Sequence, residues 1–426
     1  MDYNSYTKSI RQVFQSIINT EMNIEQKHID HIKKEFANMQ TKEDLVHLLS
    51  EANVLLYGKK SKGIQLKALT YFANPETCKV RYKTFTVKKK SGGERTINAP
   101  VKGLKSILRS LNFVLQCAYQ PHEAATGFVL NKSIVDNAKK HVGHHYVLNI
   151  DLKDFFHSFD RNRVKMGIWY NFFNLNKEKE PLAFLLASLC THPFEIDGEI
   201  KTVLPQGSPA SPTITNILCK KLDHRLNGLA NRFGATYTRY ADDITFSSQH
   251  NIYKKVEKPV LNERGAYDDF YSELERLIKG EKLIINLKKT RLQKAGYRQE
   301  VTGLKVNEKV NVHRRYIKQI RMWLYLWEKW GYELAEQKFQ KDYSKDKGHV
   351  KKNGSKLHYV IDGKLEFLKM VKGANNSTYI KLKSRFEKLV RPCKEIIESK
   401  EIDLESILEV FSKSGLREAM ELFKKN

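Results

Sequence analysis

Residues 236–247 read Thr-Tyr-Thr-Arg-Tyr-Ala-Asp-Asp-Ile-Thr-Phe-Ser and contain the most informative pattern in the chain. Strand-forming β-branched and aromatic residues flank two adjacent acids, Asp242 and Asp243, which predicts a β-hairpin with the acids at its tight turn. Adjacent carboxylates repel each other unless a cation neutralises them, and their oxygens are hard ligands that suit Mg²⁺. An ordinary Asp-rich surface turn is the alternative, and the rest of the chain disfavours it.

A second stretch supplies another acid. Residues 147–151 read Val-Leu-Asn-Ile-Asp, an apolar run of buried-strand type that ends at Asp151 and is followed by Phe155 and Phe156. Two strands that each end in a carboxylate can bring both acids to one edge of a sheet. Such a pair can bind two Mg²⁺ ions about 3.5–4 Å apart for in-line phosphoryl transfer. One ion then activates an attacking 3′-hydroxyl group and the other stabilises the leaving pyrophosphate.

With three further motifs in order along the chain, the sequence resembles the reverse transcriptases, specifically the bacterial retron-type group. The residues that carry the resemblance are 88–100, 151–156, 204–212, 240–243 and 287–290. Two shorter elements resemble the retron branch: Asn137-Ala-Lys-Lys-His141 and Val301-Thr-Gly303. Stand-alone reverse transcriptases of antiphage systems share much of this pattern, so the sequence does not separate retron enzymes from these stand-alone enzymes.

The resemblance implies an α+β right-hand polymerase with fingers, a palm and a helical thumb. We expect a helical N-terminal extension over residues 1–75, fingers and palm over 76–305, and a thumb with a helical C-terminal extension over 306–426. Apolar spacing predicts helices over 24–36 and 101–119, and a hairpin over 82–100. The motif at 204–212 predicts that one helix follows it, over 213–226. Beyond residue 306 we expect helices, an exposed loop over 341–356, and closing helices over 378–399 and 403–424.

By the same resemblance, the catalytic and metal-binding residues are carried over one at a time. Asp151 and Asp242 are expected to bind both metal ions, with help from the backbone carbonyl of Leu152. Asp243 is expected to be a secondary ligand or an electrostatic support. Lys289 is expected either to protonate the pyrophosphate as a general acid or to face a phosphate as a fixed charge.

Nucleotide-binding residues are expected on the predicted hairpin and beside the acids. Lys88 and Arg95 lie on the two sides of one turn, so both can approach one triphosphate. Phe156 is expected to pack below the incoming sugar and leave no room for a 2′-hydroxyl group, which selects dNTPs. The remaining expected contacts to the nucleotide, the template pair or the primer terminus come from Gln206, Gly207 and Tyr240.

A third set is expected either to contact the template RNA or to support the palm: Asn137, His141, Val301, Thr302 and Gly303. Trp323 belongs to a basic, tryptophan-containing segment that is expected to bind RNA.

Composition agrees with a polyanionic partner. The 426 residues include 75 Lys and Arg against 48 Asp and Glu, a net charge of +27, which favours nucleic acid. No apolar stretch reaches the roughly 18 residues of a membrane span, and no secretory signal is recognisable, so we expect a cytoplasmic protein. The five cysteines form no Cys-x-x-Cys pair, which indicates neither a zinc site nor a disulfide framework.

The sequence therefore predicts an RNA-directed DNA polymerase that copies a structured noncoding RNA into cDNA from dNTPs, with two Mg²⁺ ions, in an antiphage defence system. A group II intron-type reverse transcriptase and maturase is one alternative, and a catalytically inactive RNA-binding scaffold is another. An effector protein and self-association remain open.

Overall fold

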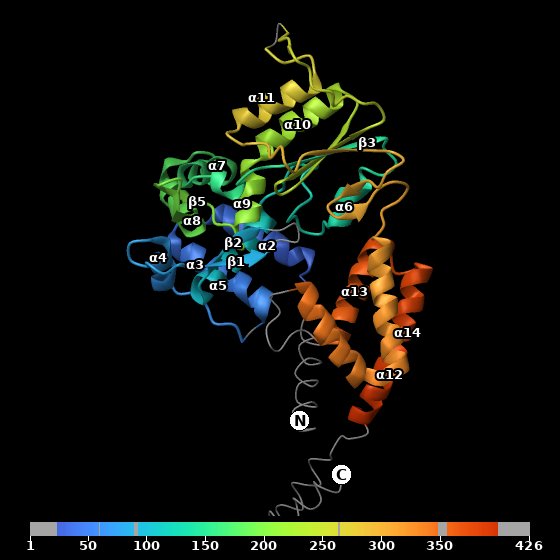
Figure 1. Ribbon diagram of the computed structural model, residues 1–426. Helices are drawn as coiled ribbons and strands as arrows, with labels where there is room; N and C mark the ends of the chain where they lie inside the picture. Colours follow the sequence, from blue (N-terminus) through green and yellow to red (C-terminus); the bar gives the residue numbers. More distant parts are fainter. Residues whose placement is uncertain (1–23, 59, 89–92, 263–264, 348–355, 399–426) are drawn as a thin grey trace, which may run out of the picture. The chain divides into compact units, whose positions relative to one another are not determined.

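The computed structural model describes residues 24–58, 60–88, 93–262, 265–347 and 356–398 (Figure 1). Its internal contacts divide the chain into two units. One unit is Met22–Asn311, and the other is Val312–Asn426 together with Met1–Glu21. The first unit contains all the acids that the sequence singles out.

A four-stranded antiparallel sheet in the order β6-β7-β3-β8 carries these acids. Its register pairs Leu148 with Phe246 and Ile150 with Ile244, so apolar side chains gather on one face. Because side chains alternate along a strand, Asn149 and its partner Thr245 lie on the opposite face. The strands are β3 (Tyr146–Asp151), β6 (Thr236–Tyr240), β7 (Asp243–Ser248) and β8 (Arg291–Lys294).

Two helices cover the apolar face of this sheet (Figure 1). They are α10 (Lys220–Arg232) and α11 (Phe270–Gly280). The ring of Phe246 on β7 meets that of Phe270 on α11 edge to face, with centroids 5.0 Å apart. These two helices thus bury the apolar side of the sheet, and the opposite side carries polar residues, several of which are also buried.

The remaining elements of this unit are helices and short hairpins around the sheet. The helices are α2 (Gln26–Asn38), α3 (Lys42–Tyr57), α4 (Leu66–Ala73), α5 (Lys102–Ala118), α6 (Ile134–Lys139), α7 (Arg161–Phe173), α8 (Glu180–Cys190) and α9 (Ser211–Leu218), with 3₁₀ turns η1 (Phe156–Ser158) and η2 (Lys177–Lys179). The strands pair as β1 (Tyr82–Lys88) with β2 (Glu94–Pro100), β4 (His192–Ile196) with β5 (Glu199–Val203), and β9 (Glu300–Val301) with β10 (Leu304–Lys305).

The structure confirms most of the expected elements of this unit and corrects one. The helices expected over 24–36 and 101–119 are present as α2 and α5, and the hairpin over 82–100 is present with residues 89–92 outside the described part. The single helix expected over 213–226 is wrong, because α9 and α10 meet at Cys219. Cys219 has ψ of 2°, far from the helical value of about −42°, so the helix axis changes direction there.

The second unit contains three helices within its described residues 312–347 and 356–398. They are α12 (Arg314–Lys347), α13 (Leu357–Lys372) and α14 (Ser377–Glu398), and they run alongside one another (Figure 1). Gly331 interrupts α12 with φ of 78°, so that Phe339 reaches back to Trp323 with ring centroids 5.2 Å apart. Across the described chain, no helix combines the length and the apolarity needed to cross a membrane.

The expected boundaries in this unit are only partly correct. The closing helix over 378–399 is confirmed by α14. The exposed loop expected over 341–356 is wrong at its start, because α12 continues to Lys347, and residues 348–355 lie outside the described part. The helix expected over 403–424 also lies outside the described residues.

A buried arginine anchors the β1–β2 hairpin. Arg81, just before β1, is 0% exposed, and its guanidinium donates to the carbonyl oxygens of Ser188, Leu189 and Thr191 at 2.8, 3.2 and 3.0 Å. These carbonyls lie at the C-terminal end of α8, where the helix has unpaired acceptors and favours a positive charge. The hairpin is thereby fixed to the body of the unit.

We expect Arg81→Met to lower the free energy of unfolding by about 2 kcal/mol, because the carbonyls of Ser188, Leu189 and Thr191 then lose their buried donor. Methionine preserves most of the side-chain volume, so the loss reports the hydrogen bonds. Chemical denaturation followed by tryptophan fluorescence measures it. Lys79→Met, at an exposed position two residues earlier, is the matched control and should change stability by less than about 0.5 kcal/mol. Equal effects of the two variants would contradict this role.

Candidate active site

Three acids meet at one edge of the sheet. The antiparallel register places Asp151, the last residue of β3, directly opposite Asp243, the first residue of β7. Asp242 lies on the turn between β6 and β7, and its carbonyl oxygen accepts a hydrogen bond from the Leu152 amide at 3.2 Å. The structure thus brings together the three acids that were expected to converge. Asp151 and Asp242 are 91 positions apart in the sequence.

Electrostatics at this edge favour the protonated form of two acids. Loss of solvent around Asp243, followed by repulsion from Asp242 and Asp151, raises the pKa of its carboxyl group to about 6. The Asp243 side chain keeps some contact with solvent. Partial loss of solvent and repulsion therefore raise its pKa together. Burial, and then repulsion from Asp151, also raises the pKa of Asp242. Carboxylates directly opposite one another in a sheet destabilise it unless a cation is present.

Lys289 supplies one such cation. Its Nζ atom donates to both oxygens of Asp151, at 2.9 Å to Oδ1 and 2.8 Å to Oδ2. The side-chain amide of Asn286 donates to Oδ1 of the same carboxylate at 2.9 Å, and the Asn286 backbone amide donates to the Asp151 carbonyl at 2.8 Å. The carboxylate of Asp151 is therefore turned toward the segment 286–289, and the two other acids have no such close partner in the described hydrogen bonds.

The donor chemistry of this edge fits a divalent cation. Among the described residues, no three His, Cys, Asp or Glu side chains form a ready set of metal ligands, and Asp151 is paired with Lys289. Yet the edge holds three carboxylates against one lysine in direct contact, and the pKa values of Asp242 and Asp243 are raised, first by burial and then by repulsion from the neighbouring acids. Oxygen-only ligands of this kind suit Mg²⁺. A bound divalent cation would replace Lys289 as the partner of Asp151.

A cavity of about 440 Å³ joins the acids to the expected nucleotide-binding residues. Arg95 of β2, Phe156 of η1 and Gln206 line it together with Asp151 and Asp242. Its other lining residues are Glu94, Thr96, Leu152, Lys153, Asp154, Phe155, His157, Asn286 and Lys289. A volume of a few hundred Å³ is typical of small-molecule sites. The cavity thus presents cationic side chains, aromatic rings and carboxylates, Asp151 and Asp242 among them, to one ligand.

The turn at Gln206 and Gly207 is bonded to the β1–β2 hairpin. The Asn98 amide of β2 donates to the Gln206 carbonyl at 2.8 Å. Gly207 has φ of 118°, and a Cβ atom at this residue would lie 2.9 Å from the Asn98 carbonyl oxygen. Glycine is therefore required by its contact with β2, and the expected close approach of Gly207 to a template base pair stays a prediction. This contact positions Arg95 and Gln206 on the same cavity.

The two phenylalanines after β3 have different surroundings. Phe155 is buried in the core, and its ring meets that of Phe156 edge to face at 5.5 Å. Phe156 is half-buried and lines the cavity. Tyr240 does not line this cavity and instead packs against Phe128 with ring centroids 5.7 Å apart. Lys88 ends β1 opposite Glu94, and its side chain lies outside the described part of the chain.

The residues expected to contact RNA or support the palm divide into two groups. Asn137, His141 and Val301 are buried, so they support the sheet from inside. His141 bonds the hydroxyl groups of Thr238 and Ser247 through its two ring nitrogens, at 2.7 Å each, and burial lowers its pKa to about 3.

Thr302 and Gly303 instead line a second cavity of about 490 Å³ with Asp151, Asp243 and Lys289. Lys288 and Arg291 line the same cavity, which therefore carries positive charge beside the acids. Trp323 of the second unit is buried against Phe339, while Trp330 on the same helix is exposed. Trp330, and not Trp323, has a surface available for stacking.

Two residues that bond the acids or the turn between them were not among the expected site residues. Asn286 bonds Asp151, and Arg239 bonds the carbonyl oxygen of Ala241. Asn286 lies next to the motif that begins at Leu287, but nothing in its local pattern indicates a long-range contact. Arg239 did give a signal, because a charged residue inside a strand that is otherwise apolar and β-branched requires a buried partner.

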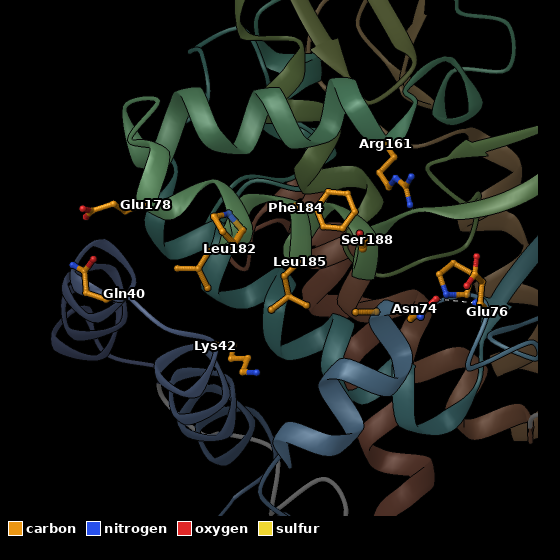
Figure 2. A pocket seen from close by; sticks show the side chains of 13 residues that line it. Gln40, Lys42, Asn74, Glu76, Arg161, Glu178, Leu182, Phe184, Leu185 and Ser188 are labelled. Carbon is orange, nitrogen blue, oxygen red and sulfur yellow. Dashed lines mark hydrogen bonds between the residues drawn. The ribbon is translucent and has the colours of Figure 1, made fainter.

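Another cavity, of about 570 Å³, lies away from the acids (Figure 2). Leu182, Phe184 and Leu185 of α8 form its apolar part, and Arg161 lies over the Phe184 ring at 5.3 Å. Charged residues of both signs also line it. Lys42 and Arg161 are basic, and Glu76 and Glu178 are acidic. None of the expected site residues lines it, so it has no part in the chemistry of the acidic edge.

Comparison with known proteins agrees with the geometry. The family model described as "Reverse transcriptase (RNA-dependent DNA polymerase)" matches residues 87–312. The retron Mx162 reverse transcriptase of Myxococcus xanthus is 37% identical over 260 residues, which cover 58% of this chain and 52% of that protein. The retron Ec86 reverse transcriptase of Escherichia coli is 37% identical over 252 residues, which cover 58% of this chain and 69% of that protein. The chain thus spans about half to two thirds of the length of these relatives.

We expect Asp243→Asn to raise the melting temperature in the absence of divalent cations at pH 7.5. The raised pKa of Asp243, about 6, means that the folded state binds the proton more tightly than the unfolded chain. Stability from this group is therefore greatest when the carboxyl is protonated and falls as the pH rises from about 4 to about 6. The gain from Asn should shrink at pH 5, where Asp243 is largely protonated.

Thermal denaturation at both pH values measures the effect. Asp197→Asn, the same change at an exposed turn between β4 and β5, serves as control and should leave the melting temperature unchanged at both. A lower melting temperature for Asp243→Asn at pH 7.5 would show that the acids at this edge do not repel one another.

Proposed function

Because the chain belongs to the reverse transcriptase family and is of the retron type, we propose that it is an RNA-directed DNA polymerase. The single observation that supports this most strongly is the shared cavity, in which Asp151 and Asp242 face Arg95, Phe156 and Gln206. The acids suit nucleotidyl transfer, and the other three residues suit a dNTP. A protein that only binds RNA has no need of three carboxylates in its binding surface.

Family membership confirms the expected fold class, an α+β right-hand polymerase. Within it, we assign residues 76–305 to fingers and palm and residues 306–426 to a helical thumb with a C-terminal extension. Residues 1–75 are the N-terminal extension in this proposal; α2, α3 and α4 are its described helices, and residues 1–23 lie outside the described part. The β1–β2 hairpin then belongs to the fingers, and the sheet β6-β7-β3-β8 is the palm.

Asp151, Asp242 and the carbonyl of Leu152 would bind two Mg²⁺ ions, with Asp243 as electrostatic support. When bound, the ions supply the positive charge that activates the primer 3′-hydroxyl group and neutralises the departing pyrophosphate. The fit rests on the three carboxylates at this edge, where burial and then mutual repulsion raise the pKa of Asp242 and Asp243.

The protein's own side chains bind and orient the nucleotide. The guanidinium of Arg95 can bond two oxygens of the triphosphate at once. Phe156 limits the space below the sugar, and Gln206 offers an amide for hydrogen bonding beside it. In this proposal Lys289 leaves its ion pair with Asp151 and contacts the negatively charged pyrophosphate. Its Nζ–H can then donate a proton to a pyrophosphate oxygen.

The template proposed is a structured noncoding RNA, with cDNA as the product. Retron enzymes are the relatives that support this choice, and the net charge of +27 suits a long polyanion. Proteins read RNA through its backbone shape and through stacking on single-stranded bases, for which the exposed Trp330 is suited. An antiphage role and a cytoplasmic location are also part of the proposal.

We expect Asp242→Asn to reduce dNTP incorporation by about a thousandfold or more, because one of the acids closest to the reacting groups loses its charge. Primer extension on an RNA template with purified protein measures this. Asp197→Asn is the matched control and should extend primers at the wild-type rate. If wild-type protein incorporates no dNTP on any primed RNA, the scaffold alternative is correct. Incorporation that survives removal of the RNA by nuclease would indicate synthesis without a template.

We also expect Phe156→Val to weaken the discrimination against ribonucleotides by about 10- to 100-fold, because the smaller side chain leaves space for a 2′-hydroxyl group. The measurement is kcat/KM for a dNTP and for the corresponding rNTP on one template. The dNTP value is the internal control and should change much less than the rNTP value. Unaltered discrimination would assign Phe156 to the core alone.

A further inference from the structure

Directly before the acidic turn, β6 carries a buried charge. Arg239 is 0% exposed, and so is its partner Asp223 on α10. The Nε and Nη2 atoms of Arg239 donate to the two carboxylate oxygens of Asp223 at 2.7 Å each. This is the bidentate arrangement that gives guanidinium–carboxylate pairs their geometric specificity. The pair fixes the plane and direction of the guanidinium beneath the turn.

The third nitrogen of the guanidinium is thereby aimed at the turn itself. Nη1 donates to the Ala241 carbonyl oxygen and to Oδ1 of Asn216, both at 3.2 Å. Ala241 has φ of 55°, a left-handed conformation that costs a residue with a Cβ atom about 1–2 kcal/mol. The peptide group that carries the Ala241 oxygen also carries the Asp242 nitrogen. A hydrogen bond to that oxygen therefore sets the orientation of the backbone from which Asp242 extends.

A neighbouring segment packs against the turn and is bonded to the same network. Asn216 of α9 donates from Nδ2 to the Gly127 carbonyl at 2.8 Å. A Cβ atom at Gly127 would lie 2.9 Å from the Ala241 nitrogen and 3.0 Å from the Tyr240 Cα. The backbone at residue 127 thus lies in close contact with the strained part of the turn. Arg239 and Gly127 together leave the Tyr240–Ala241 backbone little freedom to move.

Stability alone does not account for this ion pair. Removing two charges from water costs several kcal/mol per ion, and apolar residues of similar volume can replace a buried pair without loss of stability. Lysine cannot reproduce the contacts, because its single nitrogen cannot bond two carboxylate oxygens and a carbonyl in fixed directions. Only the rigid guanidinium group of arginine can bond both carboxylate oxygens and still donate a hydrogen bond from its third nitrogen.

We infer that Arg239, aligned by Asp223, is a positioning residue that directs Asp242 toward its catalytic location through the Ala241 carbonyl. The inference rests on the proposed function and deepens it, since it names a residue that contacts neither nucleotide nor metal and on which the geometry of the acids depends. It predicts a loss of metal affinity and of kcat without a loss of folding.

The test compares one apolar replacement of the network with a matched control. The replacement is Tyr237→Phe/Asp223→Leu/Arg239→Met, which also removes the Tyr237 hydroxyl because this group donates to Asp223 at 2.7 Å. Tyr237→Phe alone is the control, since it removes a hydrogen bond to the same carboxylate and leaves the bond from Arg239 to Ala241. Three quantities are measured: Mn²⁺ affinity by calorimetry, amide hydrogen exchange of the peptide that contains Tyr240–Asp243, and steady-state primer extension.

The triple variant should unfold cooperatively, bind Mn²⁺ about 10- to 100-fold more weakly than wild type, and lose kcat by a similar factor. Its KM for dNTP should change little, and hydrogen exchange at the turn should become faster. Tyr237→Phe should match the wild type in all three measurements. A folded triple variant with wild-type Mn²⁺ affinity, exchange and kcat overturns the inference.

Arg239→Lys provides the same test if the triple variant does not fold. It preserves the positive charge beside Asp223 and loses the bond to Ala241, so Mn²⁺ affinity and kcat should still fall by about tenfold. Wild-type values for this variant also overturn the inference. If the wild-type protein shows no polymerase activity, the proposed function fails separately, while Mn²⁺ affinity and hydrogen exchange still decide whether Arg239 positions the turn.

Discussion

Like charges placed opposite one another at a sheet edge are the constraint on which this structure depends. The register of β3 against β7 sets Asp151 across from Asp243, and the turn adds Asp242. Burial and mutual repulsion raise the pKa of Asp242 and Asp243, so the edge is unfavourable without a cation. Lys289 satisfies only Asp151. A site that is costly for the fold and suited to divalent cations is a candidate functional site, because stability alone would have selected against it.

The surrounding elements can be understood as supports for that edge. From one side, the Asn98–Gln206 hydrogen bond and the contact of Gly207 with β2 bring Arg95 into the cavity that contains the acids. Buried polar side chains also bond to the strands that carry the turn: Asp223 of α10 bonds Arg239, and His141, just after α6, bonds its two hydroxyl partners. Apolar packing could hold the same helices, but only directional bonds fix the orientation of a turn.

Much of the fold and the site could be predicted from the sequence, for identifiable reasons. Strand patterns that end in acids, and motifs in a fixed order, located Asp151, Asp242 and Asp243, and short-range patterns located α2, α5 and the β1–β2 hairpin. Long-range contacts could not be predicted: the bond of Asn286 to Asp151, the fork of Arg239 on Asp223, and the close approach of Gly207 to Asn98 join residues that no local pattern relates. The break at Cys219 was missed because one rotated ψ angle leaves no mark on apolar spacing.

The ionisation of Asp243 tests the account most directly. Carboxyl-carbon NMR of protein labelled at aspartate, assigned with Asp243→Asn, gives the pKa of this group with and without Mg²⁺. The account predicts a pKa near 6 in the absence of the ion, as the crowded and repelling neighbours require. It predicts a fall below the ordinary aspartate value of about 3.9 when Mg²⁺ is added. An ordinary pKa in both conditions would show that the acids neither repel one another nor share a cation, and the proposed active site would be contradicted.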